Sequence, residues 1–83
     1  MPNRFLIIDD DRDYLEILLM KLKSAGYKDI TGIDDPLDAA SRFYEGETFD
    51  IALIDVTMPE MDGMELLVII KNTSPNTECI MIT

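Results

Sequence analysis

Short apolar runs alternate with longer mixed stretches along this chain. The first and third runs, residues 4–8 (RFLII) and 51–55 (IALID), are apolar at almost every position. Such runs are typical of strands that are buried on both faces of a parallel sheet. A weaker run at residues 28–33 (KDITGI) and a last one at 78–82 (ECIMI) complete the pattern. The chain is therefore predicted to contain four strands.

Helical periodicity fills the intervals between these runs. Within residues 13–26, leucines recur at spacings of three and four positions: Leu15, Leu18, Leu19 and Leu22. Gly26 is predicted to end this helix.

Acidic N-caps indicate where two further helices begin. Asp35, with Pro36 at the first helical position, predicts a helix that ends near Gly46. The side chains that we expect this helix to turn inward are Leu37, Ala40, Phe43 and Tyr44. Asp62 predicts a third helix over residues 63–72.

The order of elements predicts the fold class. Strands that alternate with helices of this length form a parallel α/β sheet with right-handed crossovers. If the two most apolar strands, residues 4–8 and 51–55, are neighbours, the strand order is 2-1-3-4. In such open sheets, ligands bind outside the carboxyl ends of the strands, where the strand order reverses.

Size and charge narrow the function classes. We expect the 83 residues to form a single domain, 1–83. The net charge is −10, from 17 acidic and 7 basic residues. This surface repels nucleic acid and anionic membranes and suits cations or basic partner proteins.

Cysteine and histidine usage bears on redox chemistry and metal binding. The single Cys79 excludes an internal disulfide, fits a reducing, cytoplasmic location, and is expected to be buried and unreactive. The chain has no histidine, which leaves oxygen atoms as the plausible metal ligands. The longest apolar run, residues 66–70, is too short to cross a bilayer, and the start of the chain lacks a secretory signal pattern.

Aspartates follow the two most apolar strands. Asp9 and Asp10 follow the first, and Asp55 ends the third, so a parallel sheet brings them to one edge. Two carboxylates about 4 Å apart repel by roughly 4 kcal/mol at an effective dielectric of about 20. A hard divalent cation removes this repulsion, so we predict a Mg²⁺ site, which could also accept Mn²⁺. Asp11 is interpreted as a helix cap or a solvated residue. The alternative to a metal site for the whole cluster is that these aspartates are all helix caps.

The same residues carry a resemblance to a family. The segments LIIDDD (6–11), LIDVTMPEMDG (53–63) and IMIT (80–83) resemble the receiver domain of bacterial response regulators, in order and over the whole chain. The resemblance implies a flavodoxin-like, doubly wound sheet. It also implies a phosphoryl-accepting signalling module of a two-component phosphorelay, not an enzyme. Its partner would be a sensor histidine kinase or a phosphotransfer protein.

The resemblance also assigns roles to single residues. Asp55 matches the phosphoacceptor, and Asp9 and Asp10 match the acidic pair that binds Mg²⁺. Thr57 matches the residue whose backbone carbonyl completes the metal shell, and Thr83 matches the hydroxyl residue that contacts the phosphoryl group.

Two residues of the loop before the third helix are expected to set its turns. These are Pro59 and Gly63. Met58, Met61 and Met64 are expected to pack rather than to recognise a partner.

The resemblance is to part of a domain. A complete receiver domain continues with a fourth helix, a fifth strand and a fifth helix, and its essential lysine ends that fifth strand. We therefore expect this chain to be a truncated receiver domain, with strands three and four partly bare on one sheet face. A homodimer that covers residues 78–82 would protect the exposed edge.

Two alternative functions stay open. In a haloacid-dehalogenase-like phosphatase, Asp9 would be the nucleophile and Asp11 the acid two residues on. A receiver-like interaction module would keep the fold without being phosphorylated. Turnover of a phosphate ester would favour the first alternative, and absence of any reaction would favour the second.

Overall fold

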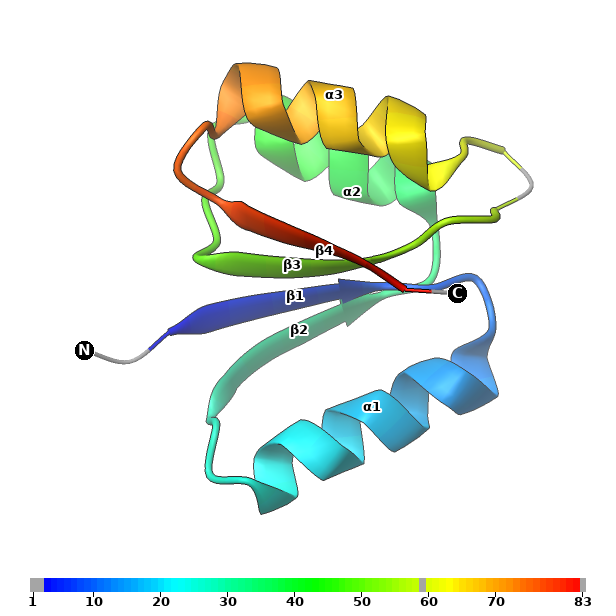
Figure 1. Cartoon of the computed structure of the whole chain (residues 1–83), viewed down its shortest axis with the longest axis vertical. Helices are drawn as coiled ribbons and strands as arrows, with labels where there is room; N and C mark the ends of the chain where they lie inside the picture. Colours follow the sequence, from blue (N-terminus) through cyan, green and yellow to red (C-terminus); the bar gives the residue numbers. More distant parts are fainter. Residues whose placement is uncertain (1–2, 59, 83) are drawn as a thin grey trace.

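The computed structural model describes residues 3–58 and 60–82, in which strands and helices alternate as expected (Figure 1). The elements are β1 (Arg4–Ile8), α1 (Arg12–Ser24), β2 (Asp29–Ile33), α2 (Pro36–Tyr44), β3 (Ile51–Asp55), α3 (Gly63–Thr73) and β4 (Glu78–Ile82). No helix among these is long and apolar enough to span a bilayer.

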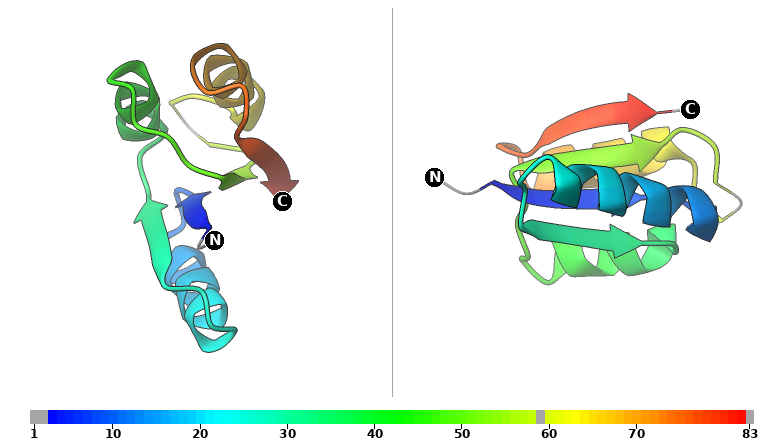
Figure 2. Two further views of the ribbon diagram at one scale, coloured as in Figure 1. Left: turned by 90° about the vertical axis from the view of Figure 1, so that its left-hand side faces the viewer. Right: turned by 90° about the horizontal axis from the view of Figure 1, so that it is seen from below.

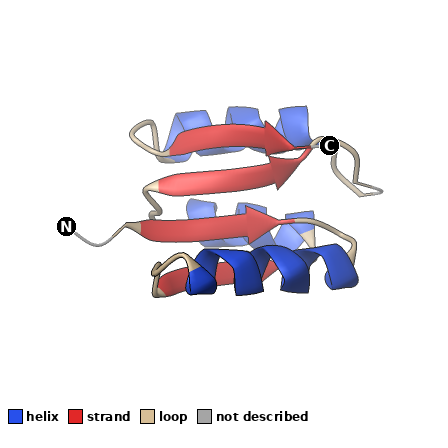
Figure 3. Cartoon of the chain, turned by 60° about the horizontal axis from the view of Figure 1, so that its bottom comes forward, coloured by secondary structure: helices blue, strands red, loops and turns tan. Residues whose placement is uncertain are grey.

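The four strands form one parallel sheet in the order β2-β1-β3-β4, which confirms the predicted fold class and strand order. All strand arrows point the same way in Figure 3. In the register, Leu53 of β3 lies between Ile7 of β1 and Ile80 of β4. The two most apolar strands therefore occupy the centre of the sheet, and the strand order reverses between them.

The helices divide between the two faces of the sheet (Figures 1 and 2). α2 and α3 cover one face, and α1 covers the other. The main core lies under α2 and α3. Its fully or nearly fully buried members include Leu6, Ile8, Phe43, Ala52, Ile54, Leu66 and Ile70. Burial of each large side chain contributes roughly 1.5–3 kcal/mol.

α1 covers only part of its face. It packs on β1 and β2, and Leu15 is its buried residue. Further across the same face, Leu53 is half-buried and Ile80 is 49% exposed. Within the described residues, β3 and β4 are therefore partly bare on the α1 side, as the sequence led us to expect.

Aspartate caps and glycines bound the helices. Asp35 is the N-cap of α2 with Pro36 as its first residue, and Asp62 caps α3 by accepting the Glu65 N–H at 2.8 Å. These caps confirm the predicted starts. Gly26, which follows the C-cap of α1, has a φ of 101°, a conformation that other residues avoid.

The expected inward face of α2 is wrong in part. Leu37 and Tyr44 are 49% and 68% exposed. The buried stripe runs instead through Pro36, Ala39, Ala40 and Phe43. Leu37 and Tyr44 each follow a buried residue by one position, which rotates them by about 100° toward solvent.

Two predictions about sulphur-containing side chains also need correction. Met58 is buried and Met61 packs on the core, which confirms their packing role, but Met64 is 55% exposed. Cys79 is half-buried rather than fully buried, and this burial raises the pKa of its thiol.

Candidate functional site

The acidic residues meet at the carboxyl edge of the sheet. Asp9 and Asp10 directly follow β1, and Asp55 is the last residue of β3. Because β1 and β3 are neighbours, with Ile8 paired to Ile54, these aspartates come together where the strand order reverses.

Asp9, Asp10 and Asp55 form a compact cluster. Each offers a carboxylate oxygen, and the three oxygens lie within 4.8 Å of one another. Asp9 is only 4% exposed, Asp55 is half-buried and Asp10 faces solvent. The structure thus brings together the three aspartates that the sequence predicted to converge.

The cluster has the donor chemistry for a hard divalent cation. Mg²⁺ prefers oxygen ligands at about 2.0–2.1 Å and keeps several waters. The three carboxylates supply such oxygens from one side. One half-exposed and one exposed carboxylate leave room for water and for a second ligand.

Asp9 is held in place by its neighbours. Its carboxylate accepts the backbone N–H of Asp11 at 3.0 Å, and its own N–H donates to the Ile33 carbonyl at 3.2 Å. A buried carboxylate therefore has at least one fixed hydrogen bond, which orients it before any ligand binds.

Asp11 serves α1. Its carboxylate accepts the N–H groups of Asp13 and Tyr14, at 3.1 and 3.3 Å, and it is the N-cap of the helix. This confirms the interpretation of Asp11 as a cap and separates it from its two acidic neighbours.

Asp55 is anchored through one oxygen. Its Oδ1 accepts the Thr57 N–H at 3.2 Å, while the Thr57 side chain is exposed. The role of the Thr57 carbonyl as a metal ligand stays a prediction.

Gly63 lies against the backbone of Asp55. A Cβ on Gly63 would sit 2.5 Å from the Asp55 carbonyl oxygen and 2.7 Å from the terminal methyl of Met81. The Gly63 N–H also donates to the Val56 carbonyl at 3.0 Å. Gly63 thus lets the start of α3 approach the end of β3, whereas the sequence had suggested a turn. Pro59 and Thr83 lie outside the described residues, so their roles stay predictions.

A cavity of about 340 Å³ surrounds the cluster. Its lining is Asp9, Asp10, Asp11, Tyr14 and Asp55. Tyr14, 39% exposed, was missed by the sequence reasoning, although its position three residues after the N-cap of α1 placed it in the first turn beside the site.

The charged groups that line this cavity are all acidic. The nearest arginine in the sequence, Arg12, pairs its guanidinium with Asp34 at 3.0 Å. Among the described residues, no ion pair to Asp9, Asp10 or Asp55 is formed. The site therefore attracts cations.

Comparison with known proteins identifies relatives that match nearly all of the chain. The response regulator receiver domain profile matches residues 5–83. The response regulator receiver protein CpdR of Brucella abortus (strain 2308) is 38% identical over 80 residues, which are 96% of this chain and 65% of CpdR. The chain thus spans just under two thirds of the length of that relative.

Solved structures agree with this relationship. A CheY-like response regulator receiver domain protein from Methanospirillum hungatei JF-1 is 31% identical with a TM-score of 0.88, over 98% of this chain and 63% of that one. The response regulator TrrA of Thermotoga maritima, in complex with Mg(2+)-BeF, is 25% identical with a TM-score of 0.85, over 95% and 67% of the two chains. The chain belongs to the family of receiver domains of two-component response regulators.

Proposed function

We propose that Asp55 is the phosphoacceptor of this receiver domain. It would take a phosphoryl group from a sensor histidine kinase or a phosphotransfer protein and thereby switch an output. The observation that carries this proposal is the position of Asp55, at the end of β3 and within 4.8 Å of the Asp9 and Asp10 carboxylates.

Asp9, Asp10 and Asp55, with the Thr57 carbonyl, are proposed to hold Mg²⁺, and Mn²⁺ has similar ligand preferences. The bound ion would neutralise charge on the oxygens of the transferred phosphoryl group. The TrrA structure, which contains Mg(2+)-BeF, supports this assignment by similarity.

The Asp55 carboxylate supplies the nucleophile of the transfer. A carboxylate oxygen of Asp55 forms a bond to phosphorus while the bond from phosphorus to the donor histidine nitrogen breaks, and the electron pair leaves with the imidazole. Oδ1 of Asp55 accepts the Thr57 N–H, which leaves the second oxygen available for attack. The attack needs no general base, because this reaction depends mostly on positioning and electrostatics. Thr83 is proposed to contact the phosphoryl group.

This function is stoichiometric, so the domain, residues 1–83, is proposed to act as a signalling module and not as an enzyme. The phosphatase alternative needs Asp11 as a general acid. The Asp11 carboxylate already caps α1 by accepting two N–H groups, and that bonding opposes the alternative.

Two further assignments complete the proposal. The half-bare sheet face beside β4, where Ile80 is 49% exposed, suits a second copy of the chain, so a homodimer through β4 is proposed. A free cysteine and the signalling role fit the cytoplasm.

Binding of beryllofluoride, a mimic of the phosphoryl group, tests the acceptor assignment. We expect a bound ¹⁹F resonance that needs Mg²⁺ and that disappears in Asp55→Asn. Asp50→Asn, which changes a carboxylate at the other end of β3, is the matched control and should keep the signal. A bound resonance that persists in Asp55→Asn would exclude Asp55 as the acceptor.

A further inference from the structure

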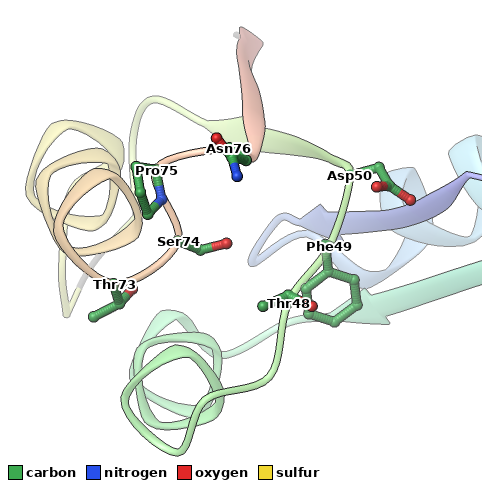
Figure 4. A pocket seen from close by; sticks show the side chains of 7 residues that line it. All are labelled: Thr48, Phe49, Asp50, Thr73, Ser74, Pro75 and Asn76. Atoms are coloured by element: carbon green, nitrogen blue, oxygen red, sulfur yellow. The ribbon is translucent and has the colours of Figure 1, made fainter.

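A second cavity lies at the opposite edge of the sheet, away from the acidic cluster. It has a volume of about 310 Å³ and sits between the segment that leads into β3 and the turn between α3 and β4 (Figure 4). Its lining is Thr48, Phe49, Asp50, Thr73, Ser74, Pro75 and Asn76. None of these residues takes part in the proposed phosphoryl transfer.

The hydrogen bonds beneath this cavity fix where the hydroxyl protons point. Thr77 donates its single hydroxyl proton to the Phe49 carbonyl at 2.6 Å. The 2.6 Å bond between the hydroxyls of Ser74 and Thr77 must therefore use the proton of Ser74. Ser74 Oγ thus keeps only lone pairs for other partners.

Ser74 is well placed to use those lone pairs. The residue is 7% exposed, and Figure 4 shows its hydroxyl pointing into the space that the lining residues enclose. At the rim, the Thr73 hydroxyl likewise donates its only proton to the Ile69 carbonyl, at 2.7 Å. Neither hydroxyl therefore has a proton left for a further partner, and Ser74 is the one that points into the cavity.

Two features of this edge attract positive charge, and the Lys71 ammonium in the last turn of α3 opposes them in part. α3 ends at Thr73, and the carbonyl end of a helix dipole attracts cations. The Asp50 carboxylate adds negative charge at the rim, where one oxygen accepts the Arg4 N–H at 2.7 Å. Figure 4 shows this side chain turned away from Ser74, so it acts through its field rather than by contact.

Two cations beside the cavity, Arg4 and Lys71, already have partners. The Arg4 guanidinium donates to the Thr48 carbonyl at 2.7 Å and lies over the Phe49 ring. Lys71 donates to the Thr77 carbonyl at 3.0 Å. Neither is among the lining residues, so neither fills the cavity.

We propose that this cavity binds a cationic N–H donor, the guanidinium or ammonium group of a basic side chain on a partner protein. The donor would bond Ser74 Oγ, beside the carbonyl end of α3. A chain with a net charge of −10 attracts such a partner surface over long range.

A ¹H–¹⁵N titration of the 83-residue chain with N-acetyl-arginine amide tests this site. Saturating Mg²⁺ is present throughout to occupy the acidic cluster. We expect saturable shifts of the amides of Thr48, Ser74 and Asn76. N-acetyl-citrulline amide, which is neutral but has almost the same shape, should cause none. Methylguanidine is the probe for a free small cation. A site for a basic side chain should bind N-acetyl-arginine amide more tightly than methylguanidine, whereas a site for a small cation should not.

Ser74→Ala is the informative variant. It removes the acceptor but leaves the bond from Thr77 to Phe49 in place, so the fold should persist in the same spectra. We expect affinity for the arginine probe to fall about fivefold or more, as for loss of one charge-assisted hydrogen bond. Ser41→Ala on α2 removes an exposed hydroxyl and should change nothing. Equal shifts with the citrulline probe, no saturable shift, or unchanged affinity in Ser74→Ala would each overturn the proposal.

Discussion

The backbone N–H of Asp11 donates to the Asp9 carboxylate across 3.0 Å, while the carboxylate of Asp11 turns to the N–H groups of α1. Two acidic residues that are two positions apart therefore have different structural roles. Asp9 belongs to the cluster with Asp10 and Asp55, and Asp11 belongs to the helix.

This division predicts the behaviour of Asp11 variants. Asp11→Ala removes a helix cap and should lower the free energy of unfolding by about 0.5–2 kcal/mol, whereas Asp11→Asn can still accept both N–H groups and should lose less. Urea unfolding measures both. The stabilisation by Mg²⁺ should survive in Asp11→Asn, and its abolition there would make Asp11 a metal ligand.

Mg²⁺ should raise the melting temperature near neutral pH, because it binds the cluster in the folded state and relieves the repulsion between Asp9, Asp10 and Asp55. Each kcal/mol of stabilisation is worth about 4–8 °C for a domain of this size. Asp10→Asn should reduce the response, measured by thermal unfolding at an ionic strength matched with NaCl.

Glu16→Gln is the control for that experiment. It removes the same charge from an exposed position on α1, outside the cluster. It should keep the full response to Mg²⁺. If the parent chain and Asp10→Asn respond equally, the metal assignment is wrong.

Gly63→Ala should destabilise the chain by about 1–3 kcal/mol, because the new Cβ meets the Asp55 carbonyl oxygen at 2.5 Å and backbone must shift. Gly32→Ala is a matched comparison, since its Cβ meets only side-chain carbons, the nearest 3.0 Å away on Leu19. Urea unfolding should rank Gly63→Ala as the more damaging change, and the reverse order would contradict the packing described for Gly63.

Cys79 predicts a pH dependence of stability. Desolvation raises the pKa of its thiol in the folded state, against the nearby charge of Lys71, which lowers it. The folded state therefore holds this proton more tightly than the unfolded state. The resulting stabilisation is complete below the pKa of the unfolded thiol, about 8.5, and is lost as pH rises through the folded pKa.

Unfolding measured from pH 7 into the alkaline range, with Cys79→Ala alongside, checks this sign. The parent chain should lose stability relative to the variant as pH rises above the unfolded pKa. A parent chain that gains stability relative to the variant over that range would mean that the thiol pKa is lowered on folding.

The apolar runs predicted the strands well, because a strand buried on both faces shows in composition alone. Asp9, Asp10 and Asp55 could be predicted to converge because parallel strands end at a common edge. Periodicity was a weaker guide for α2. The spacing of apolar residues predicted a helix but did not show which of its faces is buried, so Leu37 was assigned to the wrong side.

The close approach of Gly63 to the end of β3 could not be predicted from the sequence. A glycine beside a loop suggests a turn, and only the three-dimensional approach of α3 to the Asp55 carbonyl shows why a Cβ is excluded. The Ser74 and Thr77 hydroxyl pair depends likewise on a contact with Phe49, 28 residues away in the sequence from Thr77.

Intact mass after treatment with Mg²⁺ and a small phosphodonor shows whether Asp55 accepts a phosphoryl group. We expect one phosphoryl adduct on the chain, retained in Asp11→Asn and absent in Asp55→Asn. An adduct that persists in Asp55→Asn, or no adduct on the parent chain, would contradict the assignment of Asp55 as a working acceptor in these 83 residues.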